Sequence, residues 1–565
     1  MQYEKGLLAC REEIRDLTKK LVSIESIVNT EGEKEIARSI FELVSTFPYF
    51  EANPSHVTCE QTTKDEVERF NVLAFVNGTK GNSNRTVILM GHMDTVGVDD
   101  FNQLRDYAFL PDDWKEVLKN EDIPDTARKQ LESGDWMFGR GALDMKSGLA
   151  SNLFLLKYYA ANPDELEGNI VFLAECDEED GSHGILSALK ILKRWKEEYR
   201  FNYVAAINSD FVSPRFEGDP NRYIYKGTAG KLLPSFLVTG AETHVGTCFE
   251  GLDPNYIAAE LTKQINYNPD LCNEAHGEIT VPPVALKQTD LKPTYTVQTA
   301  LSAYTYYNFF IHSWSPKEVL DLLRGQAEIA FQNALSAFEE RHRRFCELSN
   351  QTYQALPWEP RVIIYEEMEQ MLIKAHGEEF TAYMTTFKED LLKDETLDTR
   401  MYAASVVEEA WKWMEDKNPT IILFYSSLYS PRIEITGKTA EEEILIDALD
   451  QAVEEIQPVY EHPIVVKNFF PYISDMSFVA LSDDTEGIEA VAKNNPGWGT
   501  KHFVNYQDIR DINVPVINIG PYGSDAHKKL ELLEMTYSFE VVPNLTRLVI
   551  QKVLNSKSDR EEIVS

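Results

Sequence analysis

The segment Thr86–Leu149 constrains the fold of this chain more than any other stretch. Four consecutive apolar residues, Val87–Met90, run into a glycine, and this pattern is typical of a buried strand. His92 and Asp94 follow directly, and Asp144 stands at the head of a second apolar run, ALDMKSGL. In an open α/β sheet, ligands bind beyond the carboxyl ends of such strands. The segment therefore predicts an α/β sheet with polar side chains placed for a site rather than for a core.

The composition excludes several classes of protein. A chain of 565 residues is longer than one core normally supports, so we expect more than one domain. Asp and Glu number 92 against 55 Lys and Arg, for a formal net charge of -37, which argues against nucleic-acid phosphates and anionic membranes as partners. The sequence has neither a run of about 18 apolar residues nor a signal-peptide pattern. Six cysteines without CxxC spacing complete the expectation of a cytoplasmic protein with reduced thiols.

Strand-like and helix-like segments alternate over the first 225 residues, which predicts a parallel or mixed sheet with helices on both faces. The expected segments are two helices within Glu12–Phe47, neighbouring strands at Asn71–Gly78 and Thr86–Gly91, an acidic inserted loop with a short helix at Gly97–Asp135 near the site mouth, a helix from Ser147, and strands at Asn169–Glu175 and Tyr203–Asp210 separated by a helix.

The middle of the chain has a different pattern. Residues 226–367 have α+β order, with a long helix that Ser315 caps and that carries Pro316 in its first turn. Residues 368–416 are mostly helical, and strand–helix alternation returns from Thr420. We therefore expect a first domain that begins at 1–225 and is completed within 368–565 after a helical insert, with a second domain at 226–367 between them.

Residues that bind metals recur at the ends of the predicted strands. His92, Glu179, Asp210 and His527 each follow an apolar strand, so they converge if those strands lie side by side. Together with Asp144 they make two histidines and three carboxylates without cysteine, a set that favours Zn, Mn or Co. Such a set suffices for two metal ions if one carboxylate bridges them, and a pair of this kind generates hydroxide and polarises a carbonyl.

Two further carboxylates have candidate roles beside these ligands. Asp94, two residues after His92, could orient that imidazole. Glu178 and Glu179 are adjacent and point apart, so one could bind metal while the other takes a proton from water. Taken singly, each feature has a simpler explanation: a structural His–Asp pair, a solvated DEED loop, or a helix cap at Asp210. These explanations would have to coincide at four strand ends, which favours the site.

The motifs GHMDTV, GRGALDMKSG, DEEDGS, NSD and GPYGSDAHKKLE occur in this order, and together they resemble the M20 metallopeptidase/amidohydrolase family. The resemblance runs from about residue 10 to 550 and is greatest to the arginine-utilisation (RocB) subgroup. It implies a metallo-exopeptidase-like α/β sheet sandwiched by helices, with residues 226–367 as an inserted α+β lid domain through which a homodimer can form.

The resemblance also implies a role for each site residue. One metal would be held by His92, Asp144 and Asp210, and the second by Asp144, Glu179 and His527, with zinc the first expectation and cobalt or manganese the others. The remaining roles implied are orientation of His92 by Asp94, general acid/base catalysis by Glu178, and stabilisation of the oxyanion by His244 in GAETHVGTCFEGLDPN.

One departure from the family pattern concerns the substrate. Relatives that bind a substrate α-carboxylate carry an Arg where this chain has Phe310, so another cation, such as Lys292, His312 or Arg432, would have to serve. We therefore expect a hydrolase that cleaves an amide or ureido C–N bond of a small amino-acid derivative, with arginine, ornithine or citrulline chemistry suggested by the subgroup. The alternatives are an aminopeptidase or dipeptidase of the same family, and a non-catalytic metal- or metabolite-binding regulatory protein.

Overall fold

The computed structural model describes residues 7–65 and 67–556, and the chain divides into two compact units. The first unit comprises Met1–Thr228, Ile433–Leu481 and Asn505–Ser565, and the second comprises Ala229–Arg432 and Ser482–Val504. The chain therefore passes between the units more than once. The assignment of catalytic and lid roles to parts of the chain remains a prediction.

The first unit is built on an eight-stranded sheet of order β1-β2-β5-β3-β6-β19-β7-β18. The central strands β5, β3, β6 and β19 run parallel to one another, and all eight residues of β3 are buried, as expected of a strand covered on both faces. The strands are β1 (Val57–Gln61), β2 (Phe70–Asn77), β3 (Arg85–His92), β5 (Asn169–Glu175), β6 (Asn202–Asn208), β7 (Arg222–Tyr225), β18 (Ile464–Lys467) and β19 (Val516–Asn518).

The prediction that β2 and β3 are neighbours is wrong. Strand β5 lies between them, antiparallel to β2 and parallel to β3. All seven residues of β5 are buried, so this strand pairs on both edges, and the polar loop after β2 leaves room for it. The local strand pattern is correct, but the order of the strands depends on a pairing distant in sequence.

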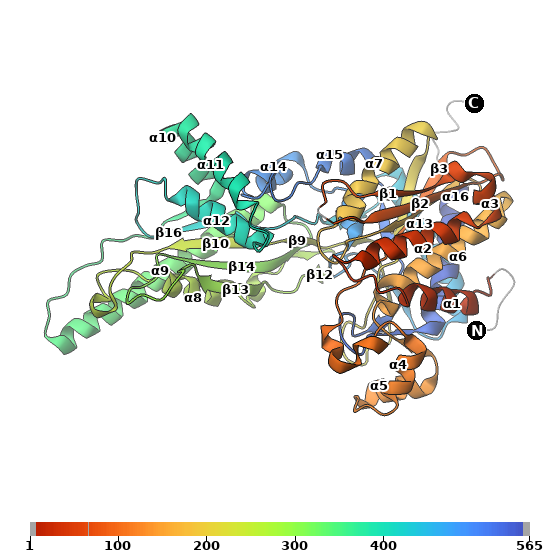
Figure 1. The fold of residues 1–565 in the computed structure, drawn as a ribbon, viewed down its shortest axis with the longest axis horizontal. Coiled ribbons are helices and arrows are strands. Elements are labelled where there is room, and N and C mark those ends of the chain that lie inside the picture. Colours follow the sequence, from red (N-terminus) through yellow and green to blue (C-terminus); the bar gives the residue numbers. More distant parts are fainter. Residues whose placement is uncertain (1–6, 66, 557–565) are drawn as a thin grey trace. The chain divides into compact units, whose positions relative to one another are not determined.

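Helices cover both faces of this sheet (Figure 1). Helix α6 connects β3 to β5, and α7 connects β5 to β6 in the opposite direction along the sheet. Because such crossovers are right-handed, the two helices lie on opposite faces. Helices α1, α6, α13 and α16 pack together, α7 packs with α15, and α2 packs on β1 and β2. Their bounds are α1 (Arg11–Val22), α2 (Glu31–Ser45), α3 (Pro48–Ala52), α6 (Ser147–Ala161), α7 (His183–Glu198), α13 (Ala440–Ile456), α15 (Tyr506–Ile512) and α16 (Val542–Asn555).

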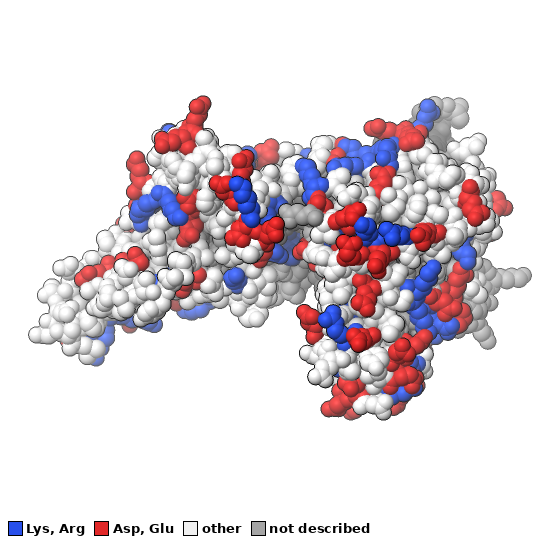
Figure 2. Space-filling model, viewed as in Figure 1, with Lys and Arg blue, Asp and Glu red and all other residues white. Residues whose placement is uncertain are grey.

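The segment predicted as a loop with one short helix is a small helical layer with its own core. It contains η2 (Asp99–Tyr107), α4 (Pro111–Leu118) and α5 (Asp125–Ser133), and Trp114 and Leu131 pack in its apolar cluster. Two prolines begin helices here, with Pro111 in the first turn of α4 and Pro124 at the N-cap of α5. Acidic side chains gather over this layer (Figure 2).

Short elements complete the first unit. A three-stranded sheet of order β20-β21-β4 lies beside the layer just described. The short elements are η1 (Pro54–His56), β4 (Trp136–Phe138), η3 (Ala142–Lys146), η4 (Pro163–Glu165), β8 (Gly227–Thr228), β17 (Ile433–Glu434), η7 (Gln457–Val459), η8 (Asp475–Phe478), β20 (Gly523–Ser524), β21 (Leu532–Glu534) and η9 (Tyr537–Val541).

The second unit has a sheet of order β13-β14-β10-β16-β15, with β9 paired to β14. A capping box at Ser315 begins the long helix α9, with Pro316 in its first turn, as predicted. Helices α10 to α12 form an apolar cluster with the sheet. The elements are β9 (Gly230–Leu232), β10 (Pro234–Thr239), η5 (Val245–Thr247), α8 (Pro254–Ile265), η6 (Pro269–Leu271), β11 (Glu274–Ala275), β12 (Glu278–Ile279), β13 (Val284–Asp290), β14 (Ser302–Ile311), α9 (Pro316–Ser349), β15 (Val362–Ile364), α10 (Tyr365–His376), α11 (Glu378–Leu391), α12 (Thr399–Trp411), β16 (Thr420–Tyr425) and α14 (Thr485–Lys493).

Two expectations from composition can be compared with the structure. All six cysteines are free. Within 7–65 and 67–556, no helix combines the length and the apolar character that a membrane crossing requires.

Candidate metal centre

The carboxyl ends of four adjacent parallel strands meet at one edge of the main sheet. Strand β3 ends at His92, and β5, β6 and β19 precede the segments that carry Glu179, Asp210 and His527. A β-carbon on Gly520 would lie 1.7 Å from the carbonyl oxygen of Asp210, so only glycine lets the chain after β19 approach β6 this closely. These four strands lie side by side, which is the condition under which the residues that follow them converge.

Asp144 lies between the two histidines. Its Oδ1 is 3.0 Å from Nε2 of His92, and its Oδ2 is 2.9 Å from Nε2 of His527. The same His527 nitrogen lies 3.1 Å from Oε1 of Glu179, and ligand atoms of His92, Asp144 and Glu179 all lie within 4.8 Å of one another. One carboxylate thus presents its two oxygens to two imidazoles, which is the arrangement that a bridging ligand requires.

Asp210 is buried beside this cluster. The side chain of Asn518 fixes its backbone, since Nδ2 donates to the Asp210 carbonyl at 2.8 Å and Oδ1 accepts from the Asp210 amide at 3.0 Å. Burial, together with the negative charge of Asp144, raises the pKa of the Asp210 carboxyl to about 7. Asp210 therefore adds a third carboxyl group beside Asp144 and Glu179.

The cluster favours bound positive charge. Hydrogen bonds to Asp144 and Glu179 raise the pKa of His527 to about 10. Burial opposes protonation of His92, but hydrogen bonds to carboxylates outweigh it and raise the pKa of this imidazole. Since histidine ligates a metal as the neutral imidazole, a divalent ion would displace these protons. Two imidazoles and three carboxylates without thiolate fit a borderline divalent ion.

Asp94 supports both the histidine and the loop that carries the glutamates. The Nδ1 atom of His92 lies 3.2 Å from the carbonyl oxygen of Asp94, and a proton on Nδ1 leaves Nε2 to face Asp144. The Asp94 carboxylate accepts hydrogen bonds from the amides of Glu178 at 3.3 Å and Glu179 at 3.1 Å. The fully buried carboxylate of Asp94 therefore fixes the position of the backbone at both glutamates.

Glu178 lies beside the cluster without belonging to it. Its Oε2 is 4.0 Å from Nε2 of His92. Burial raises the pKa of Glu178 well above its usual value, and a carboxyl with a raised pKa is suited to accept and return a proton near neutral pH.

His244 belongs to the second unit. It is exposed, its Nδ1 accepts from the amide of Gly246 at 3.0 Å, and its backbone forms a bridge with Gln298. Its predicted contact with a reacting oxygen stays a prediction.

The structure adds one buried carboxylate that the sequence reasoning missed. Oε1 of Glu531 accepts from the amides of Leu143 at 3.1 Å and Asp144 at 3.3 Å, while Oε2 accepts from Nη1 of Arg140 at 2.8 Å. Glu531 therefore fixes the backbone of the bridging residue. Its position four residues after His527 is the only signal in the sequence that could have indicated it.

Comparison with known proteins agrees with this geometry. The profile of peptidase family M20/M25/M40 matches residues 88–505. The chain belongs to the M20 family. It is 36% identical to protein RocB and 30% identical to the uncharacterized protein YqjN, both of Bacillus subtilis (strain 168), over 98% of this chain and 98% of each relative. The M20 family metallo-carboxypeptidase Sso-CP2 from Sulfolobus solfataricus superposes with a TM-score of 0.52 at 12% identity, covering 96% of this chain and 99% of that chain.

These matches confirm three of the predictions. The chain is a member of the M20 family, its fold is the mixed α/β fold of that family's solved structures, and it is an enzyme of the metallopeptidase/amidohydrolase class. Membership of a hydrolase family argues against the non-catalytic regulatory alternative. Of the five predicted ligands, His527 lies outside the matched residues 88–505, and the assignment of a role to each site residue remains a proposal.

Proposed function

We propose that this M20 protein uses two divalent metal ions to hydrolyse an amide or ureido C–N bond of a small amino-acid derivative, in arginine, ornithine or citrulline catabolism. The observation that carries the proposal is the position of Asp144 between His92 and His527, with Glu178 beside them. An acid/base residue next to a set of metal ligands is what hydrolysis needs, and a binding protein has no use for it.

The chain would hold two metals in the way that the family resemblance implies. His92, Asp144 and Asp210 would hold the first, and Asp144, Glu179 and His527 the second, with zinc the first choice and cobalt or manganese the others. When bound, such a pair lowers the pKa of water and polarises the substrate carbonyl.

The proton transfers fall to Glu178. Its carboxylate accepts a proton from water as the water oxygen forms a bond to the carbonyl carbon of the substrate, and the C–N bond then breaks as its electron pair leaves with nitrogen. Glu178 returns the proton to that nitrogen, so that an amide yields a carboxylic acid and an amine. His244 would donate a hydrogen bond to the oxyanion.

The substrate class rests on two observations. The similarity to RocB spans nearly the whole chain, which supports an arginine-related substrate. The family resemblance puts Phe310 of β14 where relatives that bind a carboxylate have Arg, so we expect another group to hold the substrate here.

Among the cations considered for a substrate carboxylate, Lys292 is favoured. Its Nζ donates to the carbonyl of Gln298 at 2.6 Å, and Gln298 is the residue that bridges to His244. By contrast, Arg432 contacts Asp483 at 3.4 Å, and His312 is buried.

The test is a hydrolysis screen of protein reconstituted with Zn, Co or Mn. Substrates are N-acyl and N-carbamoyl derivatives of arginine, ornithine and citrulline, with dipeptides as the comparison arm, and the released amine is measured. We expect turnover of at least one derivative and none by Asp144→Asn. Faster cleavage of dipeptides would favour the peptidase alternative, and no turnover by fully metallated protein would refute the proposal. Light scattering would test a homodimer through the second unit.

A further inference from the structure

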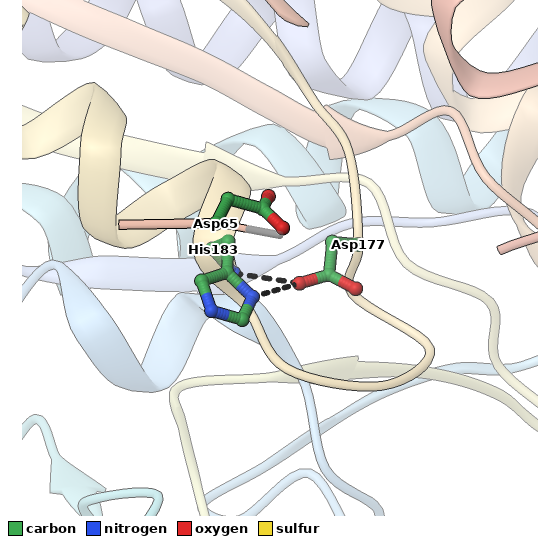
Figure 3. A group of neighbouring side chains, drawn as sticks. All are labelled: Asp65, Asp177 and His183. Carbon is green, nitrogen blue, oxygen red and sulfur yellow. Dashed lines mark hydrogen bonds and ion pairs between the residues drawn. The ribbon is translucent and has the colours of Figure 1, made fainter. Parts of the chain in front are cut away.

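A second group of metal-ligand type lies near the centre just described. Ligand atoms of Asp65, Asp177 and His183 all lie within 4.8 Å of one another, and Figure 3 shows the His183 ring directed at the Asp177 carboxylate. The cation between these carboxylates is Arg69. Its Nε and Nη2 donate to the two oxygens of Asp65 at 2.7 and 3.1 Å, and its Nη1 donates to Asp177 at 2.8 Å. The guanidinium of Arg69 therefore occupies the place that a metal ion would take between these carboxylates and offsets part of their charge, so the group calls for no third metal.

Arg69 also pairs with a third carboxylate, that of Glu33. Its side chain is 3% exposed, and Nη1 also donates to Oε2 of Glu33 at 2.9 Å. Glu33 and Asp177 are fully buried. Burial raises the pKa of Glu33 to about 8, and the charge of Arg69 opposes that rise. A planar guanidinium that serves three carboxylates at fixed angles cannot be replaced by the single point charge of a lysine.

Asp177 links this network to the loop that carries the glutamates. Its amide donates to Oε1 of Glu33 at 3.0 Å, and its carbonyl accepts from the amide of Ser182 at 2.7 Å. Its carboxylate accepts from both the amide and Nδ1 of His183, at 3.0 and 2.6 Å. Asp177 has a φ of 65°, a left-handed conformation that costs a non-glycine residue energy and persists only where its surroundings hold it.

The next two residues along the chain are Glu178 and Glu179. Asp94 holds their amides from one side, and the Arg69–Asp177 pair holds the residue directly before them. We propose that Arg69 is a positioning residue that fixes Asp177 and thereby aims Glu178 and Glu179 at the metal centre. This inference rests on the proposed function of the two glutamates and extends it to a residue that touches neither metal nor substrate.

The test compares Arg69→Met with Arg222→Met. Arg222 is a buried arginine of the same unit that is paired with Glu534 at 2.5 Å, so it controls for the loss of a buried ion pair. Metal-free proteins are titrated with Co²⁺, and binding is followed by the visible spectrum and by equilibrium dialysis. We expect Arg69→Met to weaken one of two Co²⁺ sites by about 10–100-fold, the effect typical of residues that support ligands. We expect kcat to fall by a similar factor with a smaller change in KM, and Arg222→Met to change only the melting temperature.

Chemical rescue provides the second variant. Arg69→Ala should regain Co²⁺ affinity in millimolar guanidinium but not in equal ammonium, because only guanidinium restores the planar set of donors. The inference is overturned if Arg69→Met loses melting temperature alone, as the control does, or if guanidinium restores nothing to folded Arg69→Ala. The Co²⁺ readout needs no substrate, so it decides this inference even if the wild type hydrolyses none of the compounds screened.

Discussion

Replacement of Asp94 by Asn tests the construction of the centre most directly. The fully buried Asp94 carboxylate accepts the amides of Glu178 and Glu179 at 3.3 and 3.1 Å. Asparagine keeps one acceptor oxygen and turns an NH₂ group toward the other amide, so one charge-assisted hydrogen bond is lost. Such a bond contributes about 1.5–3 kcal/mol. At about 1.4 kcal/mol per tenfold, Asp94→Asn should weaken the metal site that contains Glu179 by roughly 10–100-fold.

The assay is a Co²⁺ titration of metal-free Asp94→Asn against wild type, with Asp112→Asn as a matched control. Asp112 has a side chain that is 75% exposed and pairs with Lys19 on the surface, so its replacement should leave both sites intact. If Asp94→Asn binds two Co²⁺ ions with wild-type affinities, the amide contacts do not position the ligands and the reasoning from backbone to metal is refuted.

Three further changes have separate outcomes. Glu178→Gln should reduce turnover by about 10²–10⁴-fold, the usual contribution of a general base, with two metals still found by elemental analysis; near-normal turnover would remove Glu178 from its role. Glu531→Gln should lower the free energy of unfolding by about 1.5–3 kcal/mol, since it removes the charged acceptor that faces Arg140, and an unchanged urea midpoint would contradict this. Burial lowers the pKa of His502 to about 4. The second unit should therefore be most stable above pH 6.5, where this imidazole is neutral in both the folded and the unfolded chain. Its free energy of unfolding should fall by about 3 kcal/mol between pH 6.5 and pH 4, because the unfolded chain then binds a proton that the folded one does not. His502→Gln should flatten that dependence in urea titrations at several pH values, and a persisting slope would point to other groups.

The local patterns of the sequence identified most of the elements around the centre. The predicted strand Asn169–Glu175 has the bounds of β5, and Ser147 begins α6 as expected. Apolar run length and capping residues are local properties, so they are readable without a structure. The insertion after β3 was underestimated because a proline that begins a helix and one that ends it look alike in a single sequence.

The residue types of the candidate site could be predicted from the sequence, but the residues that position them could not. Histidine and carboxylate at strand ends are visible as residue types, and their convergence follows from parallel strands sharing one edge. Arg69 and Asn518 carry no such signal, and Glu531 is marked only by its position four residues after His527, because each acts on a partner more than 100 residues away. Their roles depend on which buried backbone groups and carboxylates the fold leaves in need of a partner.

The sequence by itself determined that the chain forms an α/β core with a set of histidines and carboxylates after its strands. Hydrophobic periodicity and residue type are properties of short segments, so they can be seen in the sequence alone. Only the tertiary structure decided that β5 lies between β2 and β3, that Asp144 lies between two imidazoles, and that a guanidinium fills the neighbouring acidic group. The physical reason is that strand pairing and the pairing of buried charges join segments that are far apart along the chain. No local pattern records which segments will meet.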